Sequence, residues 1–229
     1  MKRFRMGINM SFISVFDVLG PIMIGPSSSH TAGTAQIAFL AQKMIGGAVK
    51  KVEFTLYGSF ARTYQGHGTD RALLGGIMGF STDDTRICDS FHIAQERGLE
   101  FSFKIDKKDM DIYPNTVDIH MLSSGDREMT VRGESLGGGK VRIVRINQVE
   151  VDFTGEYSAV IVIHRDKPGI AAHITKCLSD SSVNIAFMRI FREAKGHTAY
   201  TIVESDNQLP VDIAAKIQQN SYVSDVMIV

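Results

Sequence analysis

The spacing of apolar residues divides the chain into strands and a few amphipathic helices. Apolar residues recur every three or four positions over 32–44, which predicts a helix that ends at Gly46. Over 51–57 apolar and polar residues alternate strictly, the pattern of a half-buried strand. A short helix over 14–19 would end at the following Gly-Pro pair. The same patterns predict helices over 71–78 and 89–97, and strands over 99–105, 117–122, 128–134 and 140–147.

The C-terminal third of the chain carries its own pattern. Strand, helix, strand, strand, helix and strand are predicted in that order, over 158–165, 169–178, 183–192, 199–204, 211–219 and 223–229. This order is typical of a ferredoxin-like βαββαβ unit, with both helices on one face of a four-stranded antiparallel sheet. Residues 149–155 are interpreted as a linker. We therefore expect an α+β protein with a mixed α/β domain over 1–150 and a second domain over 156–229.

Composition and charge exclude some classes of function. The chain has 229 residues, enough for two small domains, and 44% of them are apolar, as in globular proteins. Its 25 Lys and Arg residues balance 25 Asp and Glu residues, so there is no electrostatic reason to expect nucleic acid or an anionic membrane as a partner. The apolar run over 12–24 is too short and too interrupted to span a bilayer. A soluble, cytoplasmic protein is expected.

Candidate chemistry begins at Gly25–Thr31, directly before the helix predicted over 32–44. Three serines, a histidine and a threonine stand together there. The start of a helix has unpaired backbone N–H groups and a partial positive charge, which favours a carboxylate or phosphate ligand. His30 could move a proton, because histidine is the side chain whose pKa lies nearest neutrality. The alternative is a serine N-cap behind a Gly-Pro turn, with His30 merely exposed.

A second histidine-bearing stretch, Gly58–Arg71, follows the strand predicted over 51–57. Two glycines flank His67, so the backbone can bend there and approach a ligand closely. Thr69 or Asp70 is expected to cap the next helix. A flexible glycine-rich turn with a surface histidine would explain this stretch equally well by itself. Two histidines at helix starts, each beside hydroxyl groups, favour a shared site.

Two other turns are candidates for ligand contact. Gly137–Gly139 is interpreted as a bulge or tight turn, or as a loop that lets another chain approach closely, since no Lys-Ser pair opens a helix after it. In Asp166–Ile170, Pro168 fixes φ and Gly169 has no side chain, so a small ligand could meet bare N–H groups. A plain strand-to-helix connection fits the same residues.

Taken together, these stretches resemble the beta chain of bacterial iron–sulfur-dependent L-serine dehydratase. The resemblance covers essentially the whole chain. Residues 1–150 are similar to that family's α/β domain, itself similar to the allosteric substrate-binding domain of some phosphoglycerate dehydrogenases, and 156–229 resemble an ACT domain with Asp166–Ile170 as its signature turn. The family often has a histidine where this chain has Tyr113, so no titrating role is expected there. The matching residues are Gly25–Thr31, Gly58–Asp70, Tyr113–Thr116 and Ser135–Gly139 leading into Val141–Asn147.

The resemblance implies one half of an enzyme that converts L-serine into pyruvate and ammonia. Its implied partner is an alpha chain, whose cysteines hold a 4Fe–4S cluster with one iron open to substrate. The reaction needs a base for the α-proton and a Lewis acid for the departing β-hydroxyl. On this resemblance the iron is the Lewis acid. His30 is the candidate base, and His67 is a second proton carrier or polar contact.

The remaining candidate residues surround these two histidines. Serine hydroxyls and the helix start would hold the substrate carboxylate, Asp70 would orient His67 or cap its helix, and Asn115 is a further contact. The substrate-binding candidates are Ser27, Ser28, Ser29, Thr31, Asp70 and Asn115. In the ACT unit, Asp166, Gly169 and Ile170 are the candidate site of a regulatory ligand; whether the unit binds serine, another effector or only its own copy stays open. Two ACT units are expected to pair through the edges of their sheets.

Other interpretations of the same residues stay open. A His/His/Asp metal site at His30, His67 and Asp70 is a rival, but we expect no metal on this chain, because hydroxyls suit a carboxylate and the resemblance puts the metal on the partner. Cys88 and Cys177 are too few for a cluster and are expected to be reduced, buried thiols. A regulatory module of another amino-acid enzyme, such as a phosphoglycerate dehydrogenase-type enzyme, or a non-catalytic amino-acid-binding protein would need carboxylate donors but no base.

Overall fold

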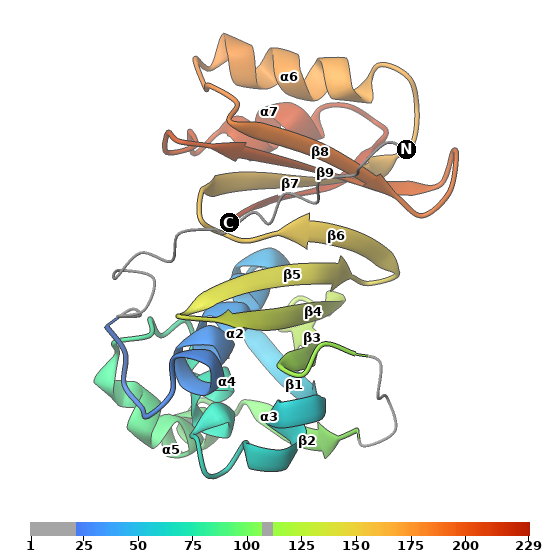
Figure 1. Ribbon diagram of the computed structural model, residues 1–229. Helices are drawn as coiled ribbons and strands as arrows, with labels where there is room; N and C mark the ends of the chain where they lie inside the picture. Colours follow the sequence, from blue (N-terminus) through green and yellow to red (C-terminus); the bar gives the residue numbers. More distant parts are fainter. Residues whose placement is uncertain (1–21, 107–111) are drawn as a thin grey trace, which may run out of the picture.

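The computed structural model describes residues 22–106 and 112–229, arranged as two sheets with helices packed on them (Figure 1). The helix expected over 14–19 lies outside the described residues. The N-terminal part consists of a π-helical turn Ser28–Ala32, α2 (Gly33–Ile45), β1 (Val49–Leu56), α3 (Gly58–Thr63), α4 (Thr69–Ile77), a 3-10 turn Thr85–Asp89, α5 (Ser90–Glu96), β2 (Glu100–Ile105), β3 (Thr116–Ser123), β4 (Glu128–Gly137), β5 (Lys140–Ile146) and β6 (Val149–Phe153).

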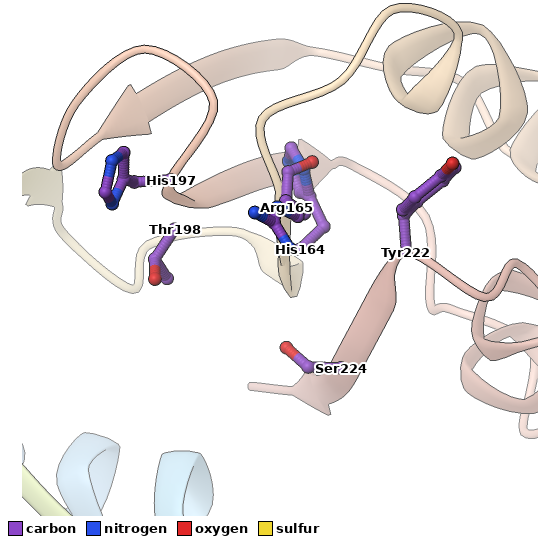
Figure 2. A pocket seen from close by; sticks show the side chains of 6 residues that line it. All are labelled: His164, Arg165, His197, Thr198, Tyr222 and Ser224. Atoms are coloured by element: carbon purple, nitrogen blue, oxygen red, sulfur yellow. The ribbon is translucent and has the colours of Figure 1, made fainter.

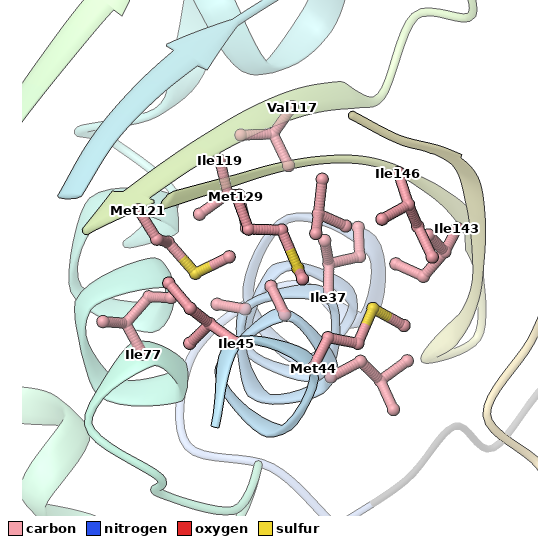
Figure 3. Packing of buried hydrophobic residues seen from close by; sticks show 14 of the residues in the cluster. Ile37, Met44, Ile45, Ile77, Val117, Ile119, Met121, Met129, Ile143 and Ile146 are labelled. Atoms are coloured by element: carbon pink, nitrogen blue, oxygen red, sulfur yellow. The ribbon is translucent and has the colours of Figure 1, made fainter. Parts of the chain in front are cut away.

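The first sheet has six strands in the order β2-β1-β3-β4-β5-β6. β1 and β2 run parallel, while the other neighbours are antiparallel. The strictly alternating β1 turns Val52, Phe54 and Leu56 toward the core, as its pattern predicts. Helix α2 lies across that face, and its apolar side chains pack against residues of β3, β4 and β5 (Figure 3). The two histidine-bearing stretches lie at the start of α2 and directly after the end of β1.

One element corrects the sequence interpretation of 149–155 as a linker. Val149–Phe153 form β6, which pairs with β5 and closes the edge of the first sheet. Val149, Val151 and Phe153 are buried, and the residues between them are exposed. This alternation is a strand signal, but it spans only five residues and was masked by the position of the segment between two larger patterns. The connection to the second sheet is consequently shorter than expected, over residues 154–157.

The C-terminal part has the predicted βαββαβ order, which confirms the α+β class. Its elements are β7 (Ser158–Arg165), α6 (Ile170–Asp180), β8 (Phe187–Arg192), β9 (Thr198–Ser205), α7 (Ile213–Gln218) and β10 (Val223–Ile228). All neighbours in the sheet order β10-β7-β9-β8 are antiparallel. Helices α6 and α7 pack on one face, where Val160, Val162 and Val203 meet Ile174 and Ile217.

The other face of this second sheet is buried against the first part of the chain. Ala159, Ile161 and Ile202 belong to the same apolar cluster as the residues of α2. Polar contacts join the two parts as well: Asn147 Nδ2 donates to the hydroxyl of Tyr200 over 3.1 Å, and Arg127 pairs with Asp225. The two sheets therefore share one continuous core, which the sequence pattern did not indicate.

Within the part of the chain that the structure describes, no helix combines the length and the apolar character needed to cross a membrane.

The crossing of α2 and α4 depends on the absence of a side chain at Gly76. An added Cβ there would lie 2.3 Å from the backbone oxygen of Ala35 and 2.7 Å from the Cβ of Ala38. Because a backbone atom cannot move aside as the end of a side chain can, we expect Gly76→Ala to lower the free energy of unfolding by about 2 kcal/mol. Urea unfolding measures this. Gly66→Ala is the matched control, because its Cβ would meet nothing closer than 3.8 Å; equal losses in both variants would contradict the packing argument.

Candidate functional site

The serine-histidine stretch forms the first turn of a helix rather than a loop before one. Ser27, in an extended conformation, is the N-cap, and the turn Ser28–Ala32 that follows is π-helical and runs directly into α2. The helix was predicted to start at Ala32, so the structure moves its beginning four residues toward the N-terminus. Short π-helical turns occur frequently at functional sites. His30 thus lies on the helix itself, with a fixed backbone.

The backbone of His30 is held by three hydroxyl groups. Its N–H donates to Ser27 Oγ over 3.1 Å. Its carbonyl oxygen accepts from Thr34 Oγ1 over 2.6 Å and from Thr69 Oγ1 over 3.0 Å. Thr34 and Thr69 are fully buried. Since Thr69 begins α4, its bond ties the start of one helix to the start of the other.

The imidazole of His30 has a hydroxyl partner at each nitrogen. Nδ1 lies 3.0 Å from Ser29 Oγ and 3.4 Å from Ser27 Oγ, and Nε2 lies 3.1 Å from Ser59 Oγ. The ring also meets the edge of the buried Phe60, with 5.2 Å between ring centres. Sequence reasoning missed Ser59, although it follows the predicted strand over 51–57 and opens the second histidine-bearing stretch. Its position at a strand end was the available signal.

The two histidine-bearing stretches meet, as two histidines at helix starts led us to expect. The rings of His30 and His67 lie 5.0 Å apart. Thr31 Oγ1 donates to the backbone oxygen of His67 over 2.9 Å, and Thr31 is only 2% exposed. Thr31 had been assigned to the substrate; in the structure its hydroxyl is buried and committed to joining the two stretches. Nδ1 of His67 is buried without a hydrogen-bond partner among the described residues.

Burial sets the charge state at this place. It lowers the pKa of His30 below the ordinary value of 6.5, and repulsion from His67 lowers it further. His30 is therefore neutral at neutral pH, with one ring nitrogen able to accept a proton. Asp70, three residues after His67, is half-buried. Burial raises the pKa of its carboxyl group more than the hydrogen bond from the Arg71 amide lowers it.

The capping role expected for Thr69 or Asp70 falls instead to Gly68. Its φ of +67° is a left-handed conformation that glycine adopts without strain. Thr69 lies inside α4 and donates to His30, as described above. Asp70 Oδ1 accepts from the amide of Arg71 over 2.8 Å and so satisfies the first turn of α4. The glycines that flank His67 lie in a turn over 64–68, as expected, while the residues before it, Gly58–Thr63, form the short helix α3.

Asn115, directly before β3, and Ser135, on β4, lie next to each other. The amide of Ser135 donates to the Asn115 carbonyl over 3.0 Å, and Asn115 Nδ2 lies 3.5 Å from the Ser135 carbonyl. Ser135 is fully buried against Gly33, where an added Cβ would lie 2.1 Å from its Oγ. Among the described residues, this Oγ has no hydrogen-bond partner. Asn115 thus serves a structural link between strands, and Ser135 stands directly behind the first turn of α2.

The corner that carries Ser59 is fixed by a polar cluster on the opposite face of the sheet. Tyr57 donates its hydroxyl to Asp118 Oδ2 over 2.9 Å, and Arg132 binds Asp118 through two nitrogens at 2.6 Å each. Burial and the negative charge of Asp118 raise the pKa of Tyr57 to about 12. Gly58 follows with φ of +50° and packs so tightly on Pro114 that a Cβ would lie 2.5 Å from its carbonyl oxygen. The position of Ser59, the second residue of α3, is therefore fixed.

The two cysteines lie in separate parts of the fold. Cys177 is half-buried on α6, but Cys88 is exposed in the 3-10 turn Thr85–Asp89, which corrects the expectation of two buried thiols. Within the described ranges, no group of three or more His, Cys, Asp and Glu side chains is close enough to hold a metal ion. A cubane cluster needs three or four cysteine thiolates together, so the residues of this chain do not fit one.

The C-terminal candidates lie around the start of α6. Gly169 has a φ of +91°, which alone accounts for a glycine here, and the side chain of Ile170 is buried in the helix–sheet core. Asp166 accepts from the Gly196 amide over 3.0 Å, and this bond, with the charge of Arg192, lowers its pKa. Beside this turn is a hollow of about 310 Å³ (Figure 2), lined by His164, Arg165, His197, Thr198, Tyr222 and Ser224.

Comparison with known proteins gives a consistent picture. Residues 14–145 match the family model "Serine dehydratase beta chain". The chain is 39% identical to the probable L-serine dehydratase beta chain of Bacillus subtilis, over 87% of this chain and 90% of that protein. It is also 39% identical to the L-serine dehydratase beta chain of Peptoniphilus asaccharolyticus, over 91% of this chain and 94% of that protein.

A more distant similarity extends to another enzyme. The D-3-phosphoglycerate dehydrogenase of Bacillus subtilis is 28% identical over 80% of this chain, but the match covers only 34% of that protein. The remaining two thirds of the dehydrogenase have no counterpart in the match, so this similarity concerns about one third of that enzyme.

Proposed function

The chain belongs to the serine dehydratase beta chain family, and from that membership we propose that it acts as the beta subunit of a two-chain L-serine dehydratase. The reaction is an α,β-elimination that yields pyruvate and ammonia, and the partner is an alpha chain. The observation that carries this proposal is His30, kept neutral by burial and surrounded by the hydroxyls of Ser27, Ser29 and Ser59.

In this proposal His30 is the base that removes the α-proton of L-serine. The Cα–H bond breaks, the proton passes to the imidazole, and the electron pair forms the Cα=Cβ bond as the Cβ–O bond breaks and hydroxide leaves, to be protonated to water. The resulting 2-aminoacrylate tautomerises to an imine, and water hydrolyses the imine to pyruvate and ammonia. A neutral imidazole is required, and the lowered pKa of His30 supplies it at neutral pH. The fixed backbone of His30 suits a base that must meet a substrate in one orientation.

Substrate contacts are assigned to groups around the first turn of α2. The hydroxyls of Ser27, Ser28 and Ser29 and the partial positive charge of the helix start would hold the carboxylate. His67, whose buried Nδ1 has no partner among the described residues, is a further polar contact. Asp70 and Asn115 would act through the elements they hold in place, α4 and β3.

A purely regulatory function is the alternative, since the chain also resembles part of a phosphoglycerate dehydrogenase. A sensor would need donors for a carboxylate but no base with a lowered pKa. The lowered pKa of His30, which leaves the ring able to accept a proton, therefore favours catalysis over sensing. We further propose that an amino-acid effector binds near Asp166, Gly169 and the hollow of Figure 2, whose lining includes Arg165.

Catalysis by His30 predicts the effect of its removal. In the enzyme assembled with an alpha chain, His30→Ala should lower kcat by roughly two to four orders of magnitude, the usual range for loss of a general base. The activity of the unmodified enzyme should also fall as pH drops through the lowered pKa of His30, because protonation removes the accepting lone pair. Pyruvate formation measures both. His92→Ala, at an exposed histidine, is the control; turnover of His30→Ala within a few-fold of normal would refute the role.

The proposed function also assigns the 4Fe–4S cluster to one of the two subunits. We propose that cysteines of the alpha chain ligate it, since Cys88 and Cys177 lie on different parts of this chain. The subunit purified alone should then be colourless, iron-free and inactive on L-serine. Anaerobic purification with iron analysis and absorption spectra tests this. The double variant Cys88→Ser, Cys177→Ser should retain most activity in the assembled enzyme. Stoichiometric iron on the lone chain would contradict the proposal.

Self-association is the last part of the proposal, and it involves the C-terminal sheet. β8 is one edge of that sheet (Figure 1). Two of its apolar side chains are partly exposed, Phe187 at 46% and Ile190 at 49%. An unpaired edge with exposed apolar residues favours pairing with the same edge of a second copy. The whole chain must be used in the test, because a fragment from Glu156 onward would expose the face now buried against α2.

Sedimentation of the full chain should accordingly report a dimer at micromolar concentration. Ile190→Glu should shift the chain toward monomer, because a charge would be buried in the paired edge. Val211→Glu is the matched control, since Val211 is fully exposed at the approach to α7. A strictly monomeric chain, or equal effects of the two substitutions, would count against pairing through β8.

A further inference from the structure

Both ring nitrogens of His30 face serine hydroxyls, but the two sides differ in the number of donors. On the Nδ1 side stand Ser29 Oγ at 3.0 Å and Ser27 Oγ at 3.4 Å, themselves 3.4 Å apart. On the Nε2 side stands Ser59 Oγ at 3.1 Å. A serine hydroxyl can donate or accept, so the position of the ring proton follows from the neighbouring groups.

Two serine hydroxyls on the Nδ1 side can donate hydrogen bonds. Ser27 Oγ already accepts the backbone N–H of His30 over 3.1 Å, so its own proton points to Ser29 Oγ or to Nδ1. When Ser27 donates to Ser29, Ser29 Oγ can direct its own proton to Nδ1. A lone pair on Nδ1 accepts from this chain of donors, and the proton of the neutral ring then lies on Nε2, where Ser59 Oγ can accept it.

Ser59 is well placed to fix this arrangement, because its backbone is anchored at both ends. Its amide donates to the carbonyl of Pro114 over 2.6 Å, and its own carbonyl accepts from Thr63 Oγ1 over 3.0 Å. The neighbouring Phe60 is fully buried and touches the His30 ring edge-on. The hydroxyl of Ser59 therefore comes from a rigid corner of the sheet, 29 residues away from the histidine that it contacts.

We propose that Ser59 is a positioning residue that holds His30 in the Nε2–H tautomer, so that His30 takes the substrate proton on Nδ1, the nitrogen that faces Ser27 and Ser29. This inference rests on the proposed function, in which His30 is the base. When the α-proton arrives at Nδ1 the ring becomes an imidazolium, and its Nε2–H remains bonded to Ser59 Oγ. The bond to Ser59 strengthens at that moment, because its donor becomes charged.

The tautomer can be measured on the isolated chain with no partner and no substrate. Long-range proton–nitrogen NMR spectra of the histidine-labelled chain distinguish a protonated from an unprotonated ring nitrogen, and His30→Gln assigns the signals. The expected result at pH 7.5 is a protonated Nε2 and an unprotonated Nδ1. In Ser59→Ala the Nδ1–H form should gain roughly five- to tenfold in population relative to Nε2–H, the effect of losing one hydrogen bond. A wild-type ring protonated on Nδ1, or a tautomer unchanged in Ser59→Ala, would overturn the inference.

Kinetics of the assembled enzyme provide the second readout. Ser59→Ala should lower kcat by up to about fivefold with little change in KM, because substrate binding stays intact while fewer molecules hold the base in its reactive form. Ser59→Thr, which keeps a hydroxyl, should restore both the tautomer and kcat. An unchanged kcat in Ser59→Ala would overturn the positioning role. If Ser59→Ala does not fold, the wild-type spectrum and Ser59→Thr decide the matter.

Thr130→Ala is the matched control, since Thr130 Oγ1 lies 3.0 Å from Nδ1 of the exposed His120 and the substitution removes a hydroxyl–histidine contact elsewhere. It should alter the signals of His120 and leave those of His30 and the turnover unchanged. The role of His30 as the base and the role of Ser59 in positioning it can be refuted separately. Full activity of His30→Ala would refute the base while the tautomer result stands, and a wrong tautomer would refute only the role of Ser59.

Discussion

The site depends on the junction between the starts of α2 and α4. Two buried threonine hydroxyls, from Thr34 and Thr69, bond to the carbonyl oxygen of His30, and Thr31 bonds to the carbonyl of His67. The bonds of Thr31 and Thr69 join the two helix starts, and the bond of Thr34 fixes the turn that carries His30. Behind the junction, Gly76 lets the two helix backbones approach closely. The position of both imidazoles follows from this junction, because neither backbone can move without breaking a buried hydrogen bond.

Charge is distributed unevenly around this junction. The side of the sheet that faces α2 is apolar, and the polar groups near His30 are mostly hydroxyls without charge. The ionic contacts collect on the opposite face, where Asp118 binds Arg132 and Arg145 and also accepts the hydroxyl of Tyr57. A site of this kind disfavours an imidazolium and so keeps His30 available as an acceptor. The charged cluster contributes indirectly, by fixing the corner from which Ser59 extends.

The C-terminal unit is part of the same packed structure. Its helices cover one face of its sheet, and α2, which continues the turn that carries His30, contributes to the cluster that covers the other face. Asn147 with Tyr200 and Arg189 with Asp152 add polar contacts across the boundary. A change in the second sheet therefore reaches residues that pack against α2, through direct contact.

The sequence by itself determined the type and order of most elements, because apolar periodicity is a local property that survives without knowledge of the partners. It also identified His30 and His67 as candidates, since hydroxyls and glycines beside a histidine are visible along the chain. Only the tertiary structure decided that β6 belongs to the first sheet, that Thr31 joins the two stretches, and that Ser59 contacts Nε2. Those outcomes depend on contacts between residues far apart in sequence, which packing of α2 on α4 and of β1 on β3 creates.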